Sequence, residues 1–248
     1  MKKMIMIWFL LYGSLFAGTI TIAVAANVSY AMDDLKKAFH ELQPDIKVQT
    51  ILGSSGKLTA QIKHGAPYQL FMSANMKYPE ALYADKIAVT VPKVYAEGTL
   101  ALFSVKAHDF SKGLGLLKER SIQKIAVANP KTAPYGIAAD EVLKNAGLYN
   151  EVKNKFIFGE SVSQTVSYAV TAADIGLIAK SSLYSRQMQK YKMNVNWKEI
   201  DPALYTPIKQ GIVILKNAGE NPEVKAFYDF ILSADAQKIL RQFGYRIP

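Results

Sequence analysis

Residues 46–72 have the sequence IKVQTILGSSGKLTAQIKHGAPYQLFM, and this stretch decides the fold class. Residues 46–52 and 68–72 are short apolar runs, which is typical of buried strands. Between them, the Gly-Ser-Ser-Gly turn at 53–56 leads into a predicted helix over 57–63. A strand, a helix and a second strand in this order predict parallel strands joined by a right-handed crossover.

The same alternation continues on both sides of this stretch. Upstream, residues 19–25 (TITIAVA) predict a strand, and residues 29–42 have the apolar spacing of a helix. Downstream, we predict strands at 99–105, 125–128, 155–158, 174–179 and 210–215, helices at 134–145 and 161–172, and two helices within 222–243. The sequence therefore predicts an α/β protein.

The order of these elements predicts two α/β lobes. We expect lobe 1 to comprise residues 18–97 together with 209–248, and lobe 2 to comprise residues 98–208. The strand at 210–215 would make the second crossing between the lobes. Two crossings form a hinge, so a ligand would lie in the cleft between the lobes.

The first residues predict export. Residues 1–17 contain Lys2 and Lys3, then an apolar run from Met4 to Phe16, then the small Ala17, as in a signal peptide. The run is shorter than the about 20 residues that span a bilayer. Later segments are less apolar, so we expect no membrane insertion. The sequence has no cysteine, so we also expect neither a disulfide nor a thiol-linked lipid anchor.

The charge pattern bears on the class of partner. The formal net charge is +10, but the basic residues are not gathered into the blocks that mark nucleic-acid patches, so we expect no nucleic-acid partner. A positive field suits a small anion, and it equally fits an ordinary basic exported protein. His40, His64 and His108 are far apart in the sequence, so we predict neither a metal site nor a cofactor.

Small or hydroxyl residues stand at strand-to-helix junctions in both predicted lobes. The first N–H groups of a helix lack partners inside the helix and carry partial positive charge, so helix starts bind anions. In open α/β sheets, ligands lie at the carboxyl ends of the strands. Each junction alone is equally an ordinary helix cap. Together they predict a small-anion cleft, and they span residues 25–29, 53–56, 132–136 and 159–163.

Five stretches of the chain are AVAANVSYAMDDL, GSSGKLTAQIKHGAPYQLFMSAN, VANPKTAPYGIAADEVLKNAG, DIGLIA and VKAFYDFILSADAQKILRQFGY. In these stretches the chain resembles the periplasmic molybdate-binding proteins of ABC importers. The resemblance implies a type II periplasmic binding fold, molybdate or tungstate as the ligand, an ABC transporter permease as the partner and a periplasmic location. We expect a monomer.

The resemblance also implies which residues contact the oxygens of the ion, with no direct metal ligation. Asn27 would offer its amide and backbone N–H, and Ser55 its hydroxyl and backbone N–H, with Ser54 as a possible helper. Tyr135 and Val162 would each offer a backbone N–H. Many family members add a Tyr hydroxyl at the position of Ala179, so that contact is missing here.

Other interpretations use the same residues. Phosphate or sulfate is the alternative ligand, with Glu160 as the acceptor for the proton of monobasic phosphate. An exported hydrolase would use Ser54 or Ser55 as its nucleophile, but Gly-Ser-Ser-Gly lacks the spacing of the Gly-x-Ser-x-Gly elbow. Asp33 and Asp34 fit better as partners of a helix dipole than as catalytic acids.

Overall fold

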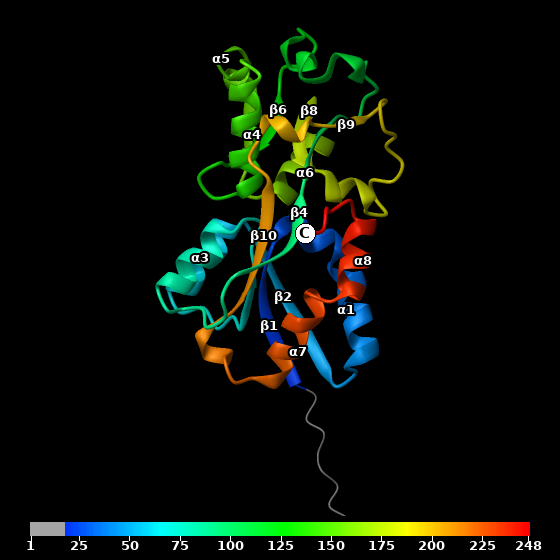
Figure 1. Cartoon of the computed structure of the whole chain (residues 1–248). Coiled ribbons are helices and arrows are strands. Elements are labelled where there is room, and N and C mark those ends of the chain that lie inside the picture. Colours follow the sequence, from blue (N-terminus) through cyan, green and yellow to red (C-terminus); the bar gives the residue numbers. More distant parts are fainter. Residues whose placement is uncertain (1–17) are drawn as a thin grey trace, which may run out of the picture.

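A computed structural model describes residues 18–248, and the predicted signal peptide, residues 1–17, lies outside the described residues. The chain forms two α/β lobes, one above the other in Figure 1. Each lobe is built on a five-stranded sheet, with strand order β2-β1-β3-β10-β4 in one and β7-β6-β8-β5-β9 in the other. The prediction of a two-lobed α/β fold is confirmed.

The first lobe contains the N-terminal parallel strands. β1 pairs in parallel with β2 and β3, and β10 is antiparallel to β3 and β4. Its strands are β1 (Gly18–Ala25), β2 (Ile46–Gly53), β3 (Leu70–Met72), β4 (Lys93–Gly98) and β10 (Ile208–Ile214). Its helices are α1 (Ser29–Leu42), α2 (Ser55–Lys63), α3 (Lys77–Ala84), α7 (Pro222–Ile231) and α8 (Ala234–Gln242).

The second lobe repeats this plan. β6 pairs in parallel with β7 and β8, and β5 is antiparallel to β8 and β9. Its strands are β5 (Leu100–Phe103), β6 (Ile125–Ala128), β7 (Phe156–Gly159), β8 (Ile175–Ala179) and β9 (Trp197–Glu199). Its helices are α4 (Pro134–Asn145), α5 (Tyr149–Val152) and α6 (Val162–Thr171). The short 3-10 segments of the chain are η1 (Ala26–Val28), η2 (Phe110–Lys118), η3 (Lys153–Lys155), η4 (Lys180–Tyr184), η5 (Pro202–Leu204) and η6 (Lys216–Ala218).

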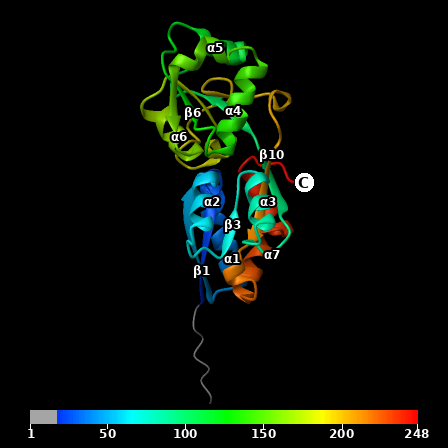
Figure 2. The same cartoon turned by 90° about the vertical axis from the view of Figure 1, so that its left-hand side faces the viewer.

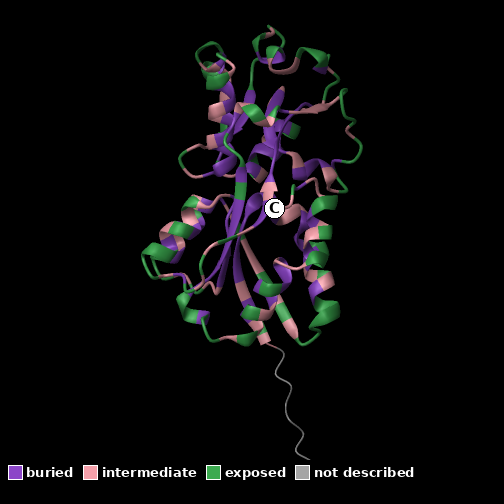
Figure 3. Cartoon of the chain, viewed as in Figure 1, coloured by how far each residue is buried: buried purple, intermediate pink, exposed green. Residues whose placement is uncertain are grey.

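Apolar runs in the strands build a separate core in each lobe. The sheets are mostly buried, and exposed residues lie on the outer faces of the helices (Figure 3). In lobe 1, α1 packs against α7 through Phe39 and Phe227, whose ring centroids are 5.0 Å apart at right angles. In lobe 2, every residue of β5, β6 and β8 is buried. Each sheet is thus a rigid platform for the loops at its strand ends.

The lobes are joined where β4 continues into β5 and where the chain returns into β10 (Figure 1). The C-terminal segment lies beside the first of these crossings, because Glu97 and Arg246 exchange two backbone hydrogen bonds of 2.7 and 2.9 Å. The division into 18–97 plus 209–248 and 98–208 stays a prediction. The positions of the two crossings support it.

The elements differ from the predicted ones where local signals conflict. The predicted helices 29–42 and 134–145 coincide with α1 and α4. The sequence did not predict α3, which carries Pro79 in its first turn, nor the three-residue β9. α2 begins at Ser55 rather than at residue 57, because Ser54 takes the extended conformation that precedes a helix.

Candidate functional site

A small cavity lies between the lobes where four helix starts meet. It is narrow, and the space that a water molecule can occupy in it is about 10 Å³. Figure 2 shows α2 of the lower lobe with one end against the upper lobe, below α6 and α4, and the Gly56–Thr132 hydrogen bond identifies that end as its start. The lining residues come from both lobes and are Ala25, Ala26, Asn27, Gly53, Ser54, Ser55, Ala74, Ala133, Pro134, Tyr135 and Val162. The structure therefore brings all five predicted site residues to one cavity.

At the first helix start, Asn27 is buried with 1% of its surface exposed. Its Nδ2 donates to Gln210 Oε1 and to the Tyr245 hydroxyl, both at 2.9 Å. These bonds use both hydrogens of the amide. The backbone N–H of Asn27 lies at the second position of η1 and has no partner inside that helix. Asn27 thus faces the cavity with its backbone donor, whereas we expected the amide to be available as well.

The second helix start presents two hydroxyl groups. Ser54 precedes α2, and its buried Oγ has no hydrogen-bond partner among the described residues. Ser55 Oγ accepts a hydrogen bond of 2.9 Å from the backbone N–H of Ala74. Because that bond uses a lone pair of Ser55, the hydroxyl proton remains available to a ligand. Both serines can therefore act as donors.

The other two helix starts belong to lobe 2. α4 begins with Pro134, which has no N–H, so Tyr135 carries the first free backbone donor. The backbone packs closely there, since a Cβ on Gly136 would lie 2.3 Å from the Ala128 carbonyl oxygen. α6 begins with Val162, and the preceding Ser161 caps the helix by accepting from the Gln164 N–H at 3.3 Å. The N–H of Val162 remains for the cavity.

The cavity is electrically positive without formal charge. Among the described residues that line it, none is charged, and four helix starts supply partial positive charge. A charged pair joins the lobes next to lining residues of the cavity, with Lys57 Nζ 3.1 Å from Glu160 Oε1. Both side chains are about half exposed. Phosphate binding would need the Glu160 carboxylate in the cavity lining, but Glu160 is not among the lining residues.

Contacts across the cleft show that the lobes are closed. The Gly56 N–H of α2 donates to the Thr132 carbonyl oxygen of lobe 2 at 2.9 Å. Ser163 Oγ of α6 donates to the Ala26 carbonyl oxygen at 2.8 Å. Closed lobes bring the two halves of the donor set within reach of one small ion.

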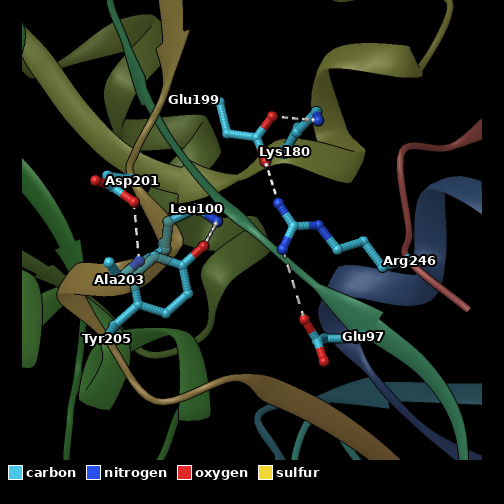
Figure 4. Close-up of polar contacts among 8 residues, drawn as sticks. All are labelled: Glu97, Leu100, Lys180, Glu199, Asp201, Ala203, Tyr205 and Arg246. Carbon is cyan, nitrogen blue, oxygen red and sulfur yellow. Dashed lines mark hydrogen bonds and ion pairs between the residues drawn. The ribbon is translucent and has the colours of Figure 1, made fainter. Parts of the chain in front are cut away.

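An ion-pair network spans the hinge behind the cavity (Figure 4). The Arg246 guanidinium lies 3.9 Å from a Glu97 carboxylate oxygen of lobe 1 and 3.6 Å from one of Glu199 in lobe 2. Lys180 also pairs with Glu199. The Tyr205 hydroxyl accepts from the Leu100 N–H at 3.1 Å, beside the first crossing. The C-terminal segment thus ties the two lobes together.

Other candidate groups lie away from the cavity. Asp33 pairs with Lys36 at 3.1 Å on α1, consistent with a role on the helix surface. Ala179 ends β8, fully buried and outside the cavity lining. Over residues 18–248, no cluster of three His, Cys, Asp or Glu side chains has the geometry to hold a metal ion. Within the same residues, helices reach neither the length nor the apolarity needed to cross a bilayer.

Sequence reasoning missed the side chains beneath the cavity. Gln210 and Tyr245 hold the Asn27 amide, yet they lie 183 and 218 residues further along the chain. Only folding brings them together, and neither belongs to a motif that marks a site. Ala74 was missed for a different reason. It contributes a backbone N–H, and the residue type does not reveal that contact.

Comparison with known proteins bears directly on this geometry. Residues 20–246 match the family described as bacterial extracellular solute-binding proteins. The molybdate-binding protein ModA of Azotobacter vinelandii is 34% identical over 231 residues, which cover 92% of this chain and 90% of the relative. The chain belongs to this solute-binding family, in its ModA branch. The resemblance that the sequence indicated is confirmed.

Two further matches agree with the ModA branch. The molybdate-binding protein ModA of Rhodobacter capsulatus is 33% identical over 92% of this chain and 88% of its own length. The structure of the Azotobacter vinelandii periplasmic molybdate-binding protein superposes with a TM-score of 0.85 at 30% identity. That superposition covers 92% of this chain and 99% of the other. As a member of the ModA branch, the chain is a substrate-binding protein of the transport type.

Proposed function

We propose that this protein captures molybdate, and tungstate with it, in the periplasm and delivers the ion to the permease of an ABC importer. The observation that carries the proposal is the convergence of four helix starts on one cavity with an uncharged lining. The ModA relatives of similar length support the choice of ion. In this proposal the protein acts as a monomer without a cofactor and catalyses no reaction.

The proposed donor set fits a fully deprotonated dianion. Such an ion only accepts hydrogen bonds, so backbone N–H groups and hydroxyls suit it and a carboxylate would repel it. The proposed donors are the N–H groups of Asn27, Ser55, Tyr135 and Val162 and the hydroxyls of Ser54 and Ser55. At about 1.5–3 kcal/mol for each charge-assisted bond, six donors supply about 9–18 kcal/mol. Nanomolar affinity corresponds to about 12 kcal/mol, after the costs of desolvation and closure.

The alternative functions fit this cavity less well. Monobasic phosphate carries a proton that needs an acceptor, and the carboxylate suggested for it, Glu160, is paired with Lys57 at the edge. A serine hydrolase needs a base within hydrogen-bond reach of its nucleophile. No histidine, aspartate or glutamate is present among the described residues of the cavity lining. Ser55 Oγ instead pairs with the backbone at Ala74.

Calorimetric titration of the purified protein with molybdate, tungstate, sulfate and phosphate tests the proposal. We expect tight binding of molybdate and tungstate and much weaker binding of sulfate and phosphate. A ligand that binds only the native state also raises the free energy of unfolding, by about 2.7 kcal/mol at a hundredfold excess over Kd. The melting temperature rises with it. Equal melting temperatures with all four ions, or tighter binding of sulfate or phosphate, would contradict the proposal.

A further inference from the structure

Beneath the cavity lies a buried set of polar side chains that the proposed donors leave unexplained. Gln210 of β10 is fully buried, and its Oε1 accepts from Asn27 Nδ2 at 2.9 Å and from the Tyr95 hydroxyl at 2.8 Å. The Tyr245 hydroxyl accepts from the same Asn27 Nδ2. The two amides thus face each other, with Asn27 Nδ2 as the donor and Gln210 Oε1 as the acceptor.

Three polar atoms of this set remain without partners among the described residues. They are Asn27 Oδ1, Gln210 Nε2 and the hydroxyl of Tyr135. The Tyr135 side chain comes from α4 of lobe 2, and its hydroxyl lies beside the Asn27 amide. A Cβ on Gly98 would stand 2.0 Å from that hydroxyl and 2.8 Å from Gln210 Nε2. Two of the three unpaired groups, the Tyr135 hydroxyl and Gln210 Nε2, therefore lie together beside Gly98 at the hinge.

The three groups are chemically complementary. Asn27 Oδ1 only accepts, Gln210 Nε2 only donates, and a tyrosine hydroxyl does both. Burial raises the pKa of Tyr135 well above its ordinary value, so the hydroxyl keeps its proton at neutral pH. Buried polar groups that stay unpaired are costly, which favours a small adjustment that pairs all three.

We propose that Asn27, Gln210 and Tyr135 form a ring of hydrogen bonds when the closed lobes hold the ligand, and that the bond from Asn27 Nδ2 to Gln210 Oε1 is the part of it already formed here. Gln210 Nε2 donates to the Tyr135 oxygen, Tyr135 donates to Asn27 Oδ1, and Asn27 Nδ2 donates to Gln210 Oε1. Asn27 and Gln210 belong to lobe 1 and its hinge strand, whereas Tyr135 enters from lobe 2. The Tyr135 hydroxyl is thus a positioning group that stabilises the closed, ligand-bound state. This inference rests on the proposed function.

Two phenylalanine variants separate this role from ordinary packing. Tyr135→Phe removes the hydroxyl but keeps the ring and the backbone N–H. We expect it to weaken molybdate binding about tenfold and to leave the melting temperature of the ligand-free protein unchanged, because the open state does not contain the bond. The matched control is Tyr95→Phe, whose bond to Gln210 lies within lobe 1 and is present in both states. It should lower the ligand-free melting temperature and leave affinity unchanged.

The measurements are calorimetric titration with molybdate and thermal unfolding without ligand, for wild type and both variants. Wild-type affinity in Tyr135→Phe would overturn the ring, as would an equal loss of affinity in Tyr95→Phe. A lower ligand-free melting temperature in Tyr135→Phe would also overturn it, because the hydroxyl would then act in general packing. If the wild-type protein binds no molybdate, the proposed function fails, and the inference that rests on it falls too.

Discussion

At the scale of single residues, the two serines at the start of α2 differ in what holds their hydroxyl groups. Ser55 Oγ is fixed by the Ala74 N–H at 2.9 Å, so it serves both the fold and the cavity. Ser54 Oγ is buried at the cavity without a partner among residues 18–248. A buried unpaired hydroxyl lowers stability unless a ligand pairs with it. We therefore expect the Ser54 hydroxyl to donate to the ligand directly, as the Ser55 hydroxyl does.

Alanine variants of the two serines should separate binding from stability. Each lost hydroxyl should weaken molybdate binding about tenfold or more, from about 1.5–3 kcal/mol per charge-assisted bond. Ser55→Ala should also lower the free energy of unfolding of the ligand-free protein by about 1–3 kcal/mol, because the buried Ala74 N–H loses its partner. Ser54→Ala should keep that stability or raise it slightly, because the buried hydroxyl that it removes has no partner.

Titration calorimetry and urea unfolding of both variants provide these values. If Ser54→Ala bound molybdate as tightly as wild type, Ser54 would be removed from the proposed donor set. If Ser55→Ala were as stable as wild type, the hydrogen bond between the Ala74 N–H and Ser55 Oγ would not contribute to the stability of the protein.

At the scale of elements, α2 reaches across the cleft at Gly56. Its N–H donates to the Thr132 carbonyl oxygen of lobe 2, and a Cβ at this position would lie only 2.9 Å from that oxygen. The Tyr78 hydroxyl, from the same lobe as Gly56, is 2.8 Å from the same point, but a side-chain end can move aside. The absence of a side chain thus lets the start of α2 approach lobe 2 closely.

Gly56→Ala should therefore destabilise the closed arrangement of the lobes. Overpacking costs about 1–3 kcal/mol, and here it applies only to the closed state, so molybdate binding should weaken at least about fivefold. The ligand-free melting temperature should stay near that of wild type. Gly115→Ala is the control, because a Cβ there meets nothing within 4 Å. Calorimetry on both variants decides the matter, and equal affinities would show that α2 does not need this close approach.

At the scale of the whole molecule, the lobes meet over buried tyrosines at the hinge. Tyr95, Tyr135 and Tyr245 each have at most 4% of their surface exposed. Burial raises the pKa of Tyr245 to about 12 and those of the other two well above the ordinary value of 10.0. Because the tyrosine pKa is higher in the folded state than in the unfolded state, its contribution to stability is fully present at pH values below the unfolded-state pKa. That stabilisation is lost as the pH rises through the folded-state pKa.

Alkaline unfolding should reveal this contribution. From these tyrosines we expect no pH dependence of the free energy of unfolding below pH about 9 and a loss between pH about 10 and 12. For Tyr245 alone the loss should reach about 2–3 kcal/mol. Urea unfolding of wild type and Tyr245→Phe at pH 8 and 11.5 measures it, because lysine titration is common to both. The stability gap between the two proteins should shrink or reverse at pH 11.5, and a constant gap would contradict the shifted pKa.

Local sequence patterns were enough to place most elements and all four strand-to-helix junctions. The branched apolar run of β1, the helical spacing of α1 and Pro134 at the start of α4 are signals carried within a few residues. α3 was missed because it has only eight residues and contains Pro79, a residue that typically marks a turn, and β9 was missed because it has only three residues. In such short elements tertiary packing outweighs local preference.

The sequence by itself determined the α/β class and the strand-to-helix junctions, and its resemblance to a known family indicated the five residues that meet at the cavity. Only the tertiary structure decided what each side chain does there. It turned the Asn27 amide toward Gln210 and Tyr245, placed the Ala74 N–H on Ser55 and paired Glu160 with Lys57. The physical reason is that a helix start follows from neighbouring residues, whereas a buried hydrogen bond depends on partners that the chain brings together from far apart.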